Sequence, residues 1–228
     1  MDESEEGRQA TAPLNPIPLV IWALVLPMVA LELYLSLAEA TGRLGLRQDL
    51  WLRMAFFPEA QRVWWAEGYV APQEWLRLVS FSFIHGGFSH ILFVAVILLA
   101  LGKFVGEVFR WWAVLLVFVV SAAAGAVLSA LLPFVTQAVF GGYPGVYGLI
   151  GAFTYVLLVG ARVTGAHPAR AFSLIAFLLG AQLVFGLAFG GGTGWVAEIG
   201  GFVTGFALSV VVNPAGWARL MAQLRRRG

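Results

Sequence analysis

Six long apolar stretches dominate this chain and restrict the folds open to it. A helix crosses the bilayer when it has roughly 20 predominantly apolar residues, because the hydrocarbon core is about 30 Å thick and a helix rises about 1.5 Å per residue. The 228 residues are 60% hydrophobic and only 11% charged, against roughly 45–50% and 25% in soluble domains. We therefore predict an all-α, polytopic membrane protein, a six-helix bundle whose spans cover residues 18–37, 88–105, 111–132, 143–163, 171–189 and 195–212.

The distribution of Lys and Arg predicts the orientation of these spans, since positive residues in short connections stay on the cytoplasmic side. Arg162 and Arg170 flank the fourth connection, whereas the third and fifth connections contain no Lys or Arg. Both termini are thus predicted to be cytoplasmic, residues 1–17 as a disordered tail and residues 215–228 as a basic tail. The first ten residues are acidic where a signal peptide would be basic, so no cleavable signal is expected. We expect the chain to reside in a bacterial inner (plasma) membrane.

The connection over residues 38–80 differs in composition from the spans. Its Arg residues are nearly balanced by acidic residues, and it contains four Trp residues. Mixed charge and aromatic side chains suit the headgroup region of a bilayer. We predict a folded, amphipathic, interfacial loop on the external face, within a single membrane domain that covers residues 18–214.

A few polar side chains lie at predicted bilayer depth. They are His85 and His90 at the start of the second span, Tyr143 and Tyr147 in the fourth, and Glu198 in the sixth. Because a polar group is costly in lipid, each of them is a candidate site residue. One interpretation is that these side chains simply satisfy one another's hydrogen bonds, as buried polar groups must. A ligand-binding or proton-sensing site is the alternative.

Other polar residues of the spans are expected to have ordinary structural roles. Glu32 and Glu107 lie nearer to span ends and are interpreted as interfacial residues. The Ser residues of the apolar runs have no base at a recognisable spacing. We expect their hydroxyls to bond to their own helix backbone, which applies to Ser121, Ser129, Ser173 and Ser209.

Glycine residues give two of the spans a smooth face. A helix face without side chains lets a neighbouring backbone approach closely, which is how many membrane helices associate. The fourth and sixth spans both carry such faces, which are formed by Gly141, Gly145, Gly148 and Gly151 and by the GxxxG pair Gly201 and Gly205. Together with the polar side chains, these faces predict a polar pocket between the second, fourth and sixth spans.

The segment FSFIHGGFSHILF resembles the second-helix signature of the rhomboid family of intramembrane serine proteases. That signature has two histidines five residues apart and an asparagine four residues later. His85 and His90 match the histidines, and Val94 stands where the asparagine would be. Arg77, eight residues before His85, is similar to the arginine of the family's Trp-Arg motif in the first loop.

The fourth and sixth spans extend the resemblance, which covers about Trp75 to Val212. The family's nucleophile lies in a Gly-x-Ser-Gly motif, and the register of the sequence YGLIGAF places Tyr143 at the serine and Pro144 at the following glycine. In the sixth span, Glu198 stands in place of the catalytic histidine of an Ala-His-x-x-Gly pattern. The resemblance therefore implies the rhomboid fold with substituted nucleophile and base positions.

These substitutions predict an inactive protease. A serine protease needs a hydroxyl activated by a nearby base and donors for the oxyanion. The phenol of Tyr143 is displaced by a ring, a carboxylate at Glu198 is a weaker base than imidazole, and Val94 donates no hydrogen bond. We predict no cofactor and no metal site, because two histidines at this spacing with one Glu lack a three-ligand geometry.

We predict that the chain binds transmembrane segments of client proteins, at a gate that the resemblance implies beside the second and fifth spans. Its partners are then the lipid bilayer and these clients. A net charge of only +2, without a basic stripe, argues against nucleic acid. Two alternatives stay open. One is an active rhomboid-type endopeptidase with a non-standard nucleophile, and the other is a small transporter or proton-linked channel built around Glu198.

Overall fold

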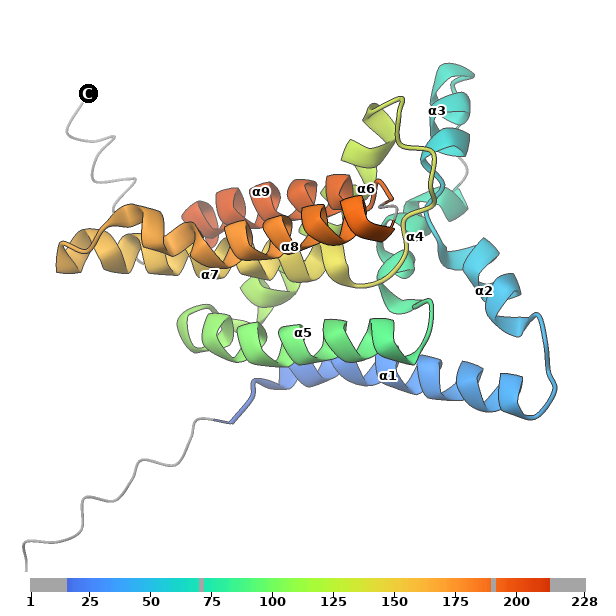
Figure 1. The fold of residues 1–228 in the computed structure, drawn as a ribbon, viewed down its shortest axis with the longest axis horizontal. Coiled ribbons are helices and arrows are strands. Elements are labelled where there is room, and N and C mark those ends of the chain that lie inside the picture. The colour runs from blue at the N-terminus through green and yellow to red at the C-terminus, as the bar shows by residue number, and fades with distance from the viewer. Residues whose placement is uncertain (1–15, 70–71, 190–191, 214–228) are drawn as a thin grey trace, which may run out of the picture.

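The computed structural model describes residues 16–69, 72–189 and 192–213, and this part of the chain is helical with short connections (Figure 1). It confirms the all-α, polytopic fold class. Within these described ranges, five helices are long and apolar enough to cross a membrane: α1 (Leu19–Ala40), α5 (Phe88–Val108), α6 (Trp111–Leu131), α7 (Tyr143–Thr164) and α9 (Trp195–Val212). The predicted fifth span corresponds to α8 (Ser173–Phe189), which has 17 residues and is shorter than these five. The predicted count of six spans is therefore not confirmed.

The connection between α1 and α5 is organised as short helices. These are α2 (Leu46–Met54), α3 (Pro58–Ala66), α4 (Pro72–Ser80) and the 3-10 helix η1 (Phe81–Phe83). Phe56 and Val139 exchange two backbone hydrogen bonds of 3.0 and 2.8 Å, which tie this connection to the segment before α7. The Arg62 guanidinium donates to three carbonyls at and beyond the end of α6, at 3.2–3.4 Å. The loop is thus folded against the bundle, while its position among the lipid headgroups stays a prediction.

Glycine residues allow α6, α7 and α9 to pack closely. A Cβ added at Gly205 of α9 would lie 2.5 Å from the carbonyl carbon and Cα of Gly148 in α7, and one added at Gly151 would lie 2.6 Å from the Phe206 nitrogen. Real Cβ atoms do not approach other atoms this closely. The α7 and α9 backbones are therefore in contact through the smooth faces predicted from the sequence.

The same glycines bring α7 against α6 at its start. A Cβ at Gly145 would lie 2.6–2.8 Å from the ring of Phe118 in α6. On α9, a Cβ at Gly201 would lie 2.9–3.2 Å from the carbonyl carbon and Cα of Pro144. The first turn of α7 is consequently fixed between α6 and α9.

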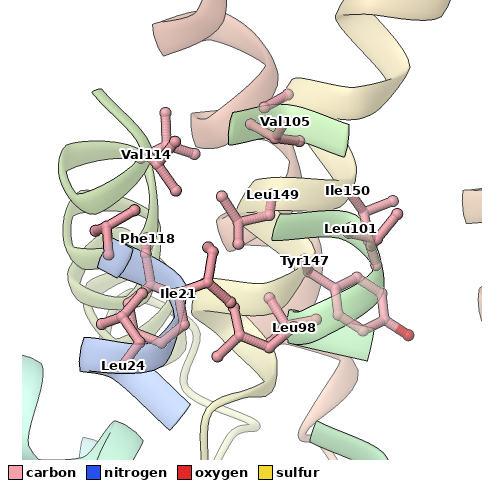
Figure 2. Packing of buried hydrophobic residues seen from close by; sticks show 14 of the residues in the cluster. Ile21, Leu24, Leu98, Leu101, Val105, Val114, Phe118, Tyr147, Leu149 and Ile150 are labelled. Atoms are coloured by element: carbon pink, nitrogen blue, oxygen red, sulfur yellow. The ribbon is translucent and has the colours of Figure 1, made fainter. Parts of the chain in front are cut away.

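A second layer is formed by α1 and α5, which pack side by side along their lengths (Figure 1). Gly102 of α5 lies against Ile21 of α1, where a Cβ would have no space. Figure 2 shows the apolar cluster that joins this layer to α6 and α7, with Leu98 of α5, Phe118 of α6 and Leu149 of α7 close together. Lipid tails are as apolar as these side chains, so the hydrophobic effect contributes little to the association of membrane helices. The van der Waals contacts of this interdigitated packing are therefore the main attraction between the layers.

The remaining helix, α8, follows the 3-10 helix η2 (Pro168–Phe172) and packs on α7. The chain passes back and forth through the bundle, so α1 begins and α9 ends at the same end, on the left in Figure 1. The segments before α5 and before α7 lie together at the opposite end. This second end holds the candidate site.

Candidate functional site

Two glycines before α5 place the histidine pair at the mouth of the bundle. Gly87 has φ of +144°, a conformation that favours glycine, and α5 begins at the next residue. His85 lies in the extended segment before this turn and is 2% exposed. Its Nε2 accepts a hydrogen bond of 3.3 Å from the Gly142 N–H. His90 lies in the first turn of α5, and its Nδ1 accepts a hydrogen bond of 3.3 Å from the Gly86 N–H.

The turn before α7 holds the fourth predicted span against these histidines. Gly141 has φ of +90° and a Cβ there would lie 2.6 Å from Cε1 and Nε2 of His90. The Gly141 N–H donates to the Phe81 carbonyl at 2.8 Å. Val94 fills the other side of this turn, since its Cγ1 would lie 2.8 Å from a Cβ at Gly142. Only glycine fits at both positions, so the turn and the histidines form one packed unit.

Tyr143, the first residue of α7, stacks on His90. The ring centroids are 5.1 Å apart with an angle of 18° between the planes. The His85 and His90 rings meet edge to face with their centroids 5.1 Å apart, and the Phe140 ring also meets His90 edge to face, at 5.7 Å between centroids. The histidines therefore lie in an aromatic stack, in which His90 Nε2 is buried without a hydrogen-bond partner among the described residues.

Glu198 of α9 approaches the same stack from the third helix. It is 7% exposed, and the Tyr147 phenol makes a side-chain hydrogen bond to it. Tyr143 is close enough to this carboxylate to interact with it electrostatically. Figure 2 shows the Tyr147 ring at the edge of the apolar cluster, with its hydroxyl oxygen pointing away from the cluster. The structure thus brings together the histidines, Tyr143, Tyr147 and Glu198 from α5, α7 and α9.

Burial keeps His85 neutral. Desolvation, followed by repulsion from a charged His90, lowers the pKa of His85 from its ordinary 6.5 to about 3, despite an opposing backbone hydrogen bond at Phe83. A neutral imidazole with Nε2 accepting from Gly142 carries its proton on Nδ1. His85 therefore supports the turn before α7 as a hydrogen-bond acceptor at any physiological pH.

Glu32, predicted to be an interfacial residue, is buried in the protein and forms an ion pair. Glu32 is 2% exposed, and its two oxygens accept hydrogen bonds of 2.8 and 3.0 Å from the Arg47 guanidinium. Arg47 also donates to Glu39 at 2.8 and 3.1 Å and to the His85 carbonyl at 3.0 Å. The hydrogen bonds to Glu32 and then Glu39 raise the pKa of Arg47 above its ordinary value. This ion pair fixes α2 to α1 and to the histidine segment.

Sequence reasoning missed Arg47, which no motif marks. The signal that was present is Glu32 itself, because a carboxylate well inside an apolar helix calls for a partner of opposite charge. The partner lies 15 residues away on another helix. Its identity therefore depends on how α2 folds back over α1.

Arg77, the predicted loop arginine, lies at the edge of the site. Its Nη1 donates to the Ala55 carbonyl at 2.7 Å and its Nε lies 3.2 Å from Glu74. The guanidinium also covers the Phe57 ring at 5.4 Å from the ring centroid. Arg77 consequently joins α4 to the segment between α2 and α3, and it contacts none of the pocket side chains in these interactions.

The Ser hydroxyls mostly bond to backbone carbonyls. Ser129 and Ser209 donate to the residue four positions earlier in their own helix, at 3.0 and 2.7 Å, as predicted. Ser173 donates to the carbonyl three positions earlier, in η2, at 2.9 Å. The prediction is wrong for Ser121, whose buried hydroxyl has no hydrogen-bond partner among the described residues, and Ser82 shares this property. Ser82 is the buried Ser next in sequence to the histidine segment, so it is the alternative nucleophile to test.

Comparison with known proteins identifies the family. Residues 72–215 match the Rhomboid domain, which covers more than half of the chain and runs from α4 beyond α9. The chain belongs to the rhomboid family. This rhomboid is 30% identical over 142 residues to "Rhomboid-type serine protease 2" of Emericella nidulans, covering 62% of the chain and 28% of that protein. It is 29% identical over 144 residues to "RHOMBOID-like protein 4" of Arabidopsis thaliana, covering 63% of the chain and 35% of that protein.

The aligned region spans about a third of the length of each of these relatives. Both relatives are eukaryotic proteins, and the bacterial membrane stays a prediction. The rhomboid domain and the apolar helices place the chain in a lipid bilayer.

Proposed function

We propose that this rhomboid protein does not hydrolyse peptide bonds and binds transmembrane segments of client membrane proteins. The observation that carries the proposal is the stacking of Tyr143 on His90. A nucleophile needs its hydroxyl within about 2.6–3.2 Å of a base. Here the imidazole faces the flat side of the phenol ring, and its Nδ1 already accepts from Gly86. The stack thus fills the space between α5 and α7 with an aromatic ring.

The other two substituted positions support inactivity. Glu198 is engaged with Tyr147, and a carboxylate is a weaker base than imidazole at neutral pH. Val94 is fully buried against the turn before α7 and offers no donor to an oxyanion. Loss of one oxyanion donor typically lowers kcat by about 100- to 1,000-fold, so the three changes together leave no route for efficient acyl transfer.

Client binding is supported by the dimensions of the bundle and the placement of α8. A helix of 17 residues is about 25 Å long, near the lower limit of roughly 17 residues for a span. We propose that α8 also spans the membrane as the fifth of six spans, and that both termini are cytoplasmic. Short spans thin the surrounding bilayer at modest cost, which would help a client helix to unwind partly. The proposed contact surface is the gate beside α5 and α8.

An activity-based label tests the first half of the proposal. The purified chain is treated with a fluorophosphonate probe beside a triple variant carrying Tyr143→Ser, Glu198→His and Val94→Asn. We expect no labelling of the native chain. A second variant that adds Pro144→Gly controls for the turn, because Pro144 is fixed in the first turn of α7 against Gly201.

Labelling of the native chain would contradict inactivity. If that labelling disappears in Ser82→Ala and persists in the matched Ser129→Ala, the chain is an active protease with Ser82 as its nucleophile. Ser129 is a suitable control because its buried hydroxyl already bonds to its own helix.

Client binding requires a separate measurement. Energy transfer in liposomes compares the purified chain with two labelled single-span peptides of equal length, one of continuous Leu and one with a central Gly-Pro break. We expect stronger association with the broken peptide, since a partly unwound helix exposes backbone groups that need partners. Equal association of the two peptides would refute selective client binding and would leave inactivity untouched.

A further inference from the structure

A groove lies at the end of the bundle opposite the histidines, between the C-terminal part of α7 and η2. Its volume is about 390 Å³, within the range of roughly 300–1,000 Å³ seen for small-molecule sites. Leu157, Gly160 and Ala161 line it on the α7 side. His167 and Arg170 line it on the other side, where the chain turns from α7 into η2.

Small residues keep the groove open. A Cβ added at Gly160 would meet no atom of the described residues within 4 Å, in contrast to Gly145, Gly148 and Gly151 of the same helix, which contact α6 or α9. Gly160 therefore packs against none of the described helices. Its lack of a side chain leaves a hollow that none of the described residues fills.

One end of the groove is positively charged, at Arg170, and the other end, at Leu157, is apolar. None of the described residues that line it is acidic, and Arg170 has no ion pair among the described residues. The His167 Nδ1 accepts from the Ala169 N–H at 3.3 Å, which leaves Nε2 as a donor. Leu157 lies further back along α7, towards the middle of this apolar helix.

We propose that this groove binds an anionic membrane phospholipid. The phosphate would lie at Arg170 and His167, and an acyl chain would run along α7 past Gly160 and Leu157. A basic pocket between membrane helices at the bilayer surface is the arrangement that recognises anionic headgroups. A free anion would gain nothing from the apolar half of the groove, so the occupant is a lipid. The proposal does not depend on whether the chain is a protease.

The bound lipid would stabilise α8. This helix follows η2 directly and packs on η2 and α7, so a ligand that bridges α7 and η2 holds the base of α8. The stability of α8 against α7 would then depend on the anionic lipid content of the membrane.

Two matched pairs of variants test the site in the full chain. Arg170→Gln removes the charge in the groove, and Arg162→Gln removes a charge in the last turn of α7 that does not line the groove. Gly160→Leu fills the hollow, and Gly180→Leu places the same side chain at another open helical glycine, on α8. Helicity by circular dichroism confirms that each variant is folded.

Native mass spectrometry counts the dioleoylphosphatidylglycerol molecules retained by the chain in detergent, with dioleoylphosphatidylcholine and inorganic phosphate as comparison ligands. We expect one tightly retained phosphatidylglycerol, bound about five-fold more weakly by Arg170→Gln, the loss expected for one basic residue near the membrane surface. Gly160→Leu should abolish retention. Arg162→Gln and Gly180→Leu should leave it unchanged.

Other outcomes would overturn the proposal. An equal loss in Arg162→Gln and Arg170→Gln would mean diffuse attraction to anionic lipid. Equal retention of phosphatidylcholine would mean that the charge has no role, and displacement by inorganic phosphate would mean an anion site without a lipid. If Gly160→Leu fails to fold, the comparison of the two Arg variants decides the question.

Discussion

Replacing Gly205 with alanine perturbs the contact that holds α9, and with it Glu198, against α7. The added Cβ would lie 2.5 Å from two backbone atoms of Gly148, where ordinary contacts are 3.4–4 Å. Backbone cannot rotate away as a side chain can, so the two helices must separate by about 1 Å. Such overpacking costs about 1–3 kcal/mol, and a rigid backbone contact belongs at the upper end. The higher helix propensity of alanine offsets about 1 kcal/mol of this loss of stability. We therefore expect Gly205→Ala to lower the free energy of unfolding by about 2 kcal/mol.

The measurement is reversible unfolding of the purified chain in mixed micelles with increasing dodecyl sulfate, followed by circular dichroism. Gly180→Ala is the control, because a Cβ at Gly180 would meet no atom of the described part of the chain within 4 Å. It should stabilise the chain by no more than about 1 kcal/mol. If Gly205→Ala is as stable as Gly180→Ala, the α7 and α9 backbones are not in contact. Glu198 would then not be held beside Tyr143 and Tyr147, since Gly201 and Gly205 position the helix that carries it.

Three further predictions follow from polar contacts. Arg47→Gln should destabilise the chain by about 3–5 kcal/mol, because it leaves a buried carboxylate at Glu32 unpaired, and adding Glu32→Gln should restore much of that loss in the same unfolding assay. His85→Gln should remove a pH dependence of the free energy of unfolding. Because the pKa of His85 is lowered from 6.5 to about 3 in the folded chain, the unfolded state takes up a proton first and is favoured as the pH falls between these values. Between pH 6.5 and pH 5 the free energy of unfolding should therefore fall by about 2 kcal/mol more in the native chain than in the variant. Arg62→Ala should cost about 1–3 kcal/mol by leaving carbonyls beyond α6 without a donor, whereas Arg43→Ala, at an exposed position, should change stability by less than about 0.5 kcal/mol.

The spans were predictable because lipid is the solvent for most of this chain. A run of about 20 apolar residues has few alternatives to a membrane helix, and the five long helices match their predicted ranges to within three residues at each end. The glycine faces were predictable for the same reason, since a helix face follows from a regular spacing. For α8 the composition predicts a span, but its length falls just short of those of the other helices.

The pocket was predictable as a group of residues and not as a geometry. That His90, Tyr143 and Glu198 share one pocket followed from their places in three spans. The stacking of Tyr143 on His90 did not, because it depends on the left-handed turn at Gly141 and on the close approach of Val94 to that turn. Polar side chains in a membrane form hydrogen bonds or ion pairs, but the sequence does not identify the partner of each one.

The sequence by itself determined which segments are apolar enough to cross a bilayer and which helix faces are smooth. Those properties are local, because they depend on residue type and on spacing within one helix. Only the tertiary structure decided that Arg47 pairs with Glu32 and that no described residue fills the hollow at Gly160. Both depend on how helices distant in sequence are placed against each other, and that placement is set by the summed packing of the whole bundle.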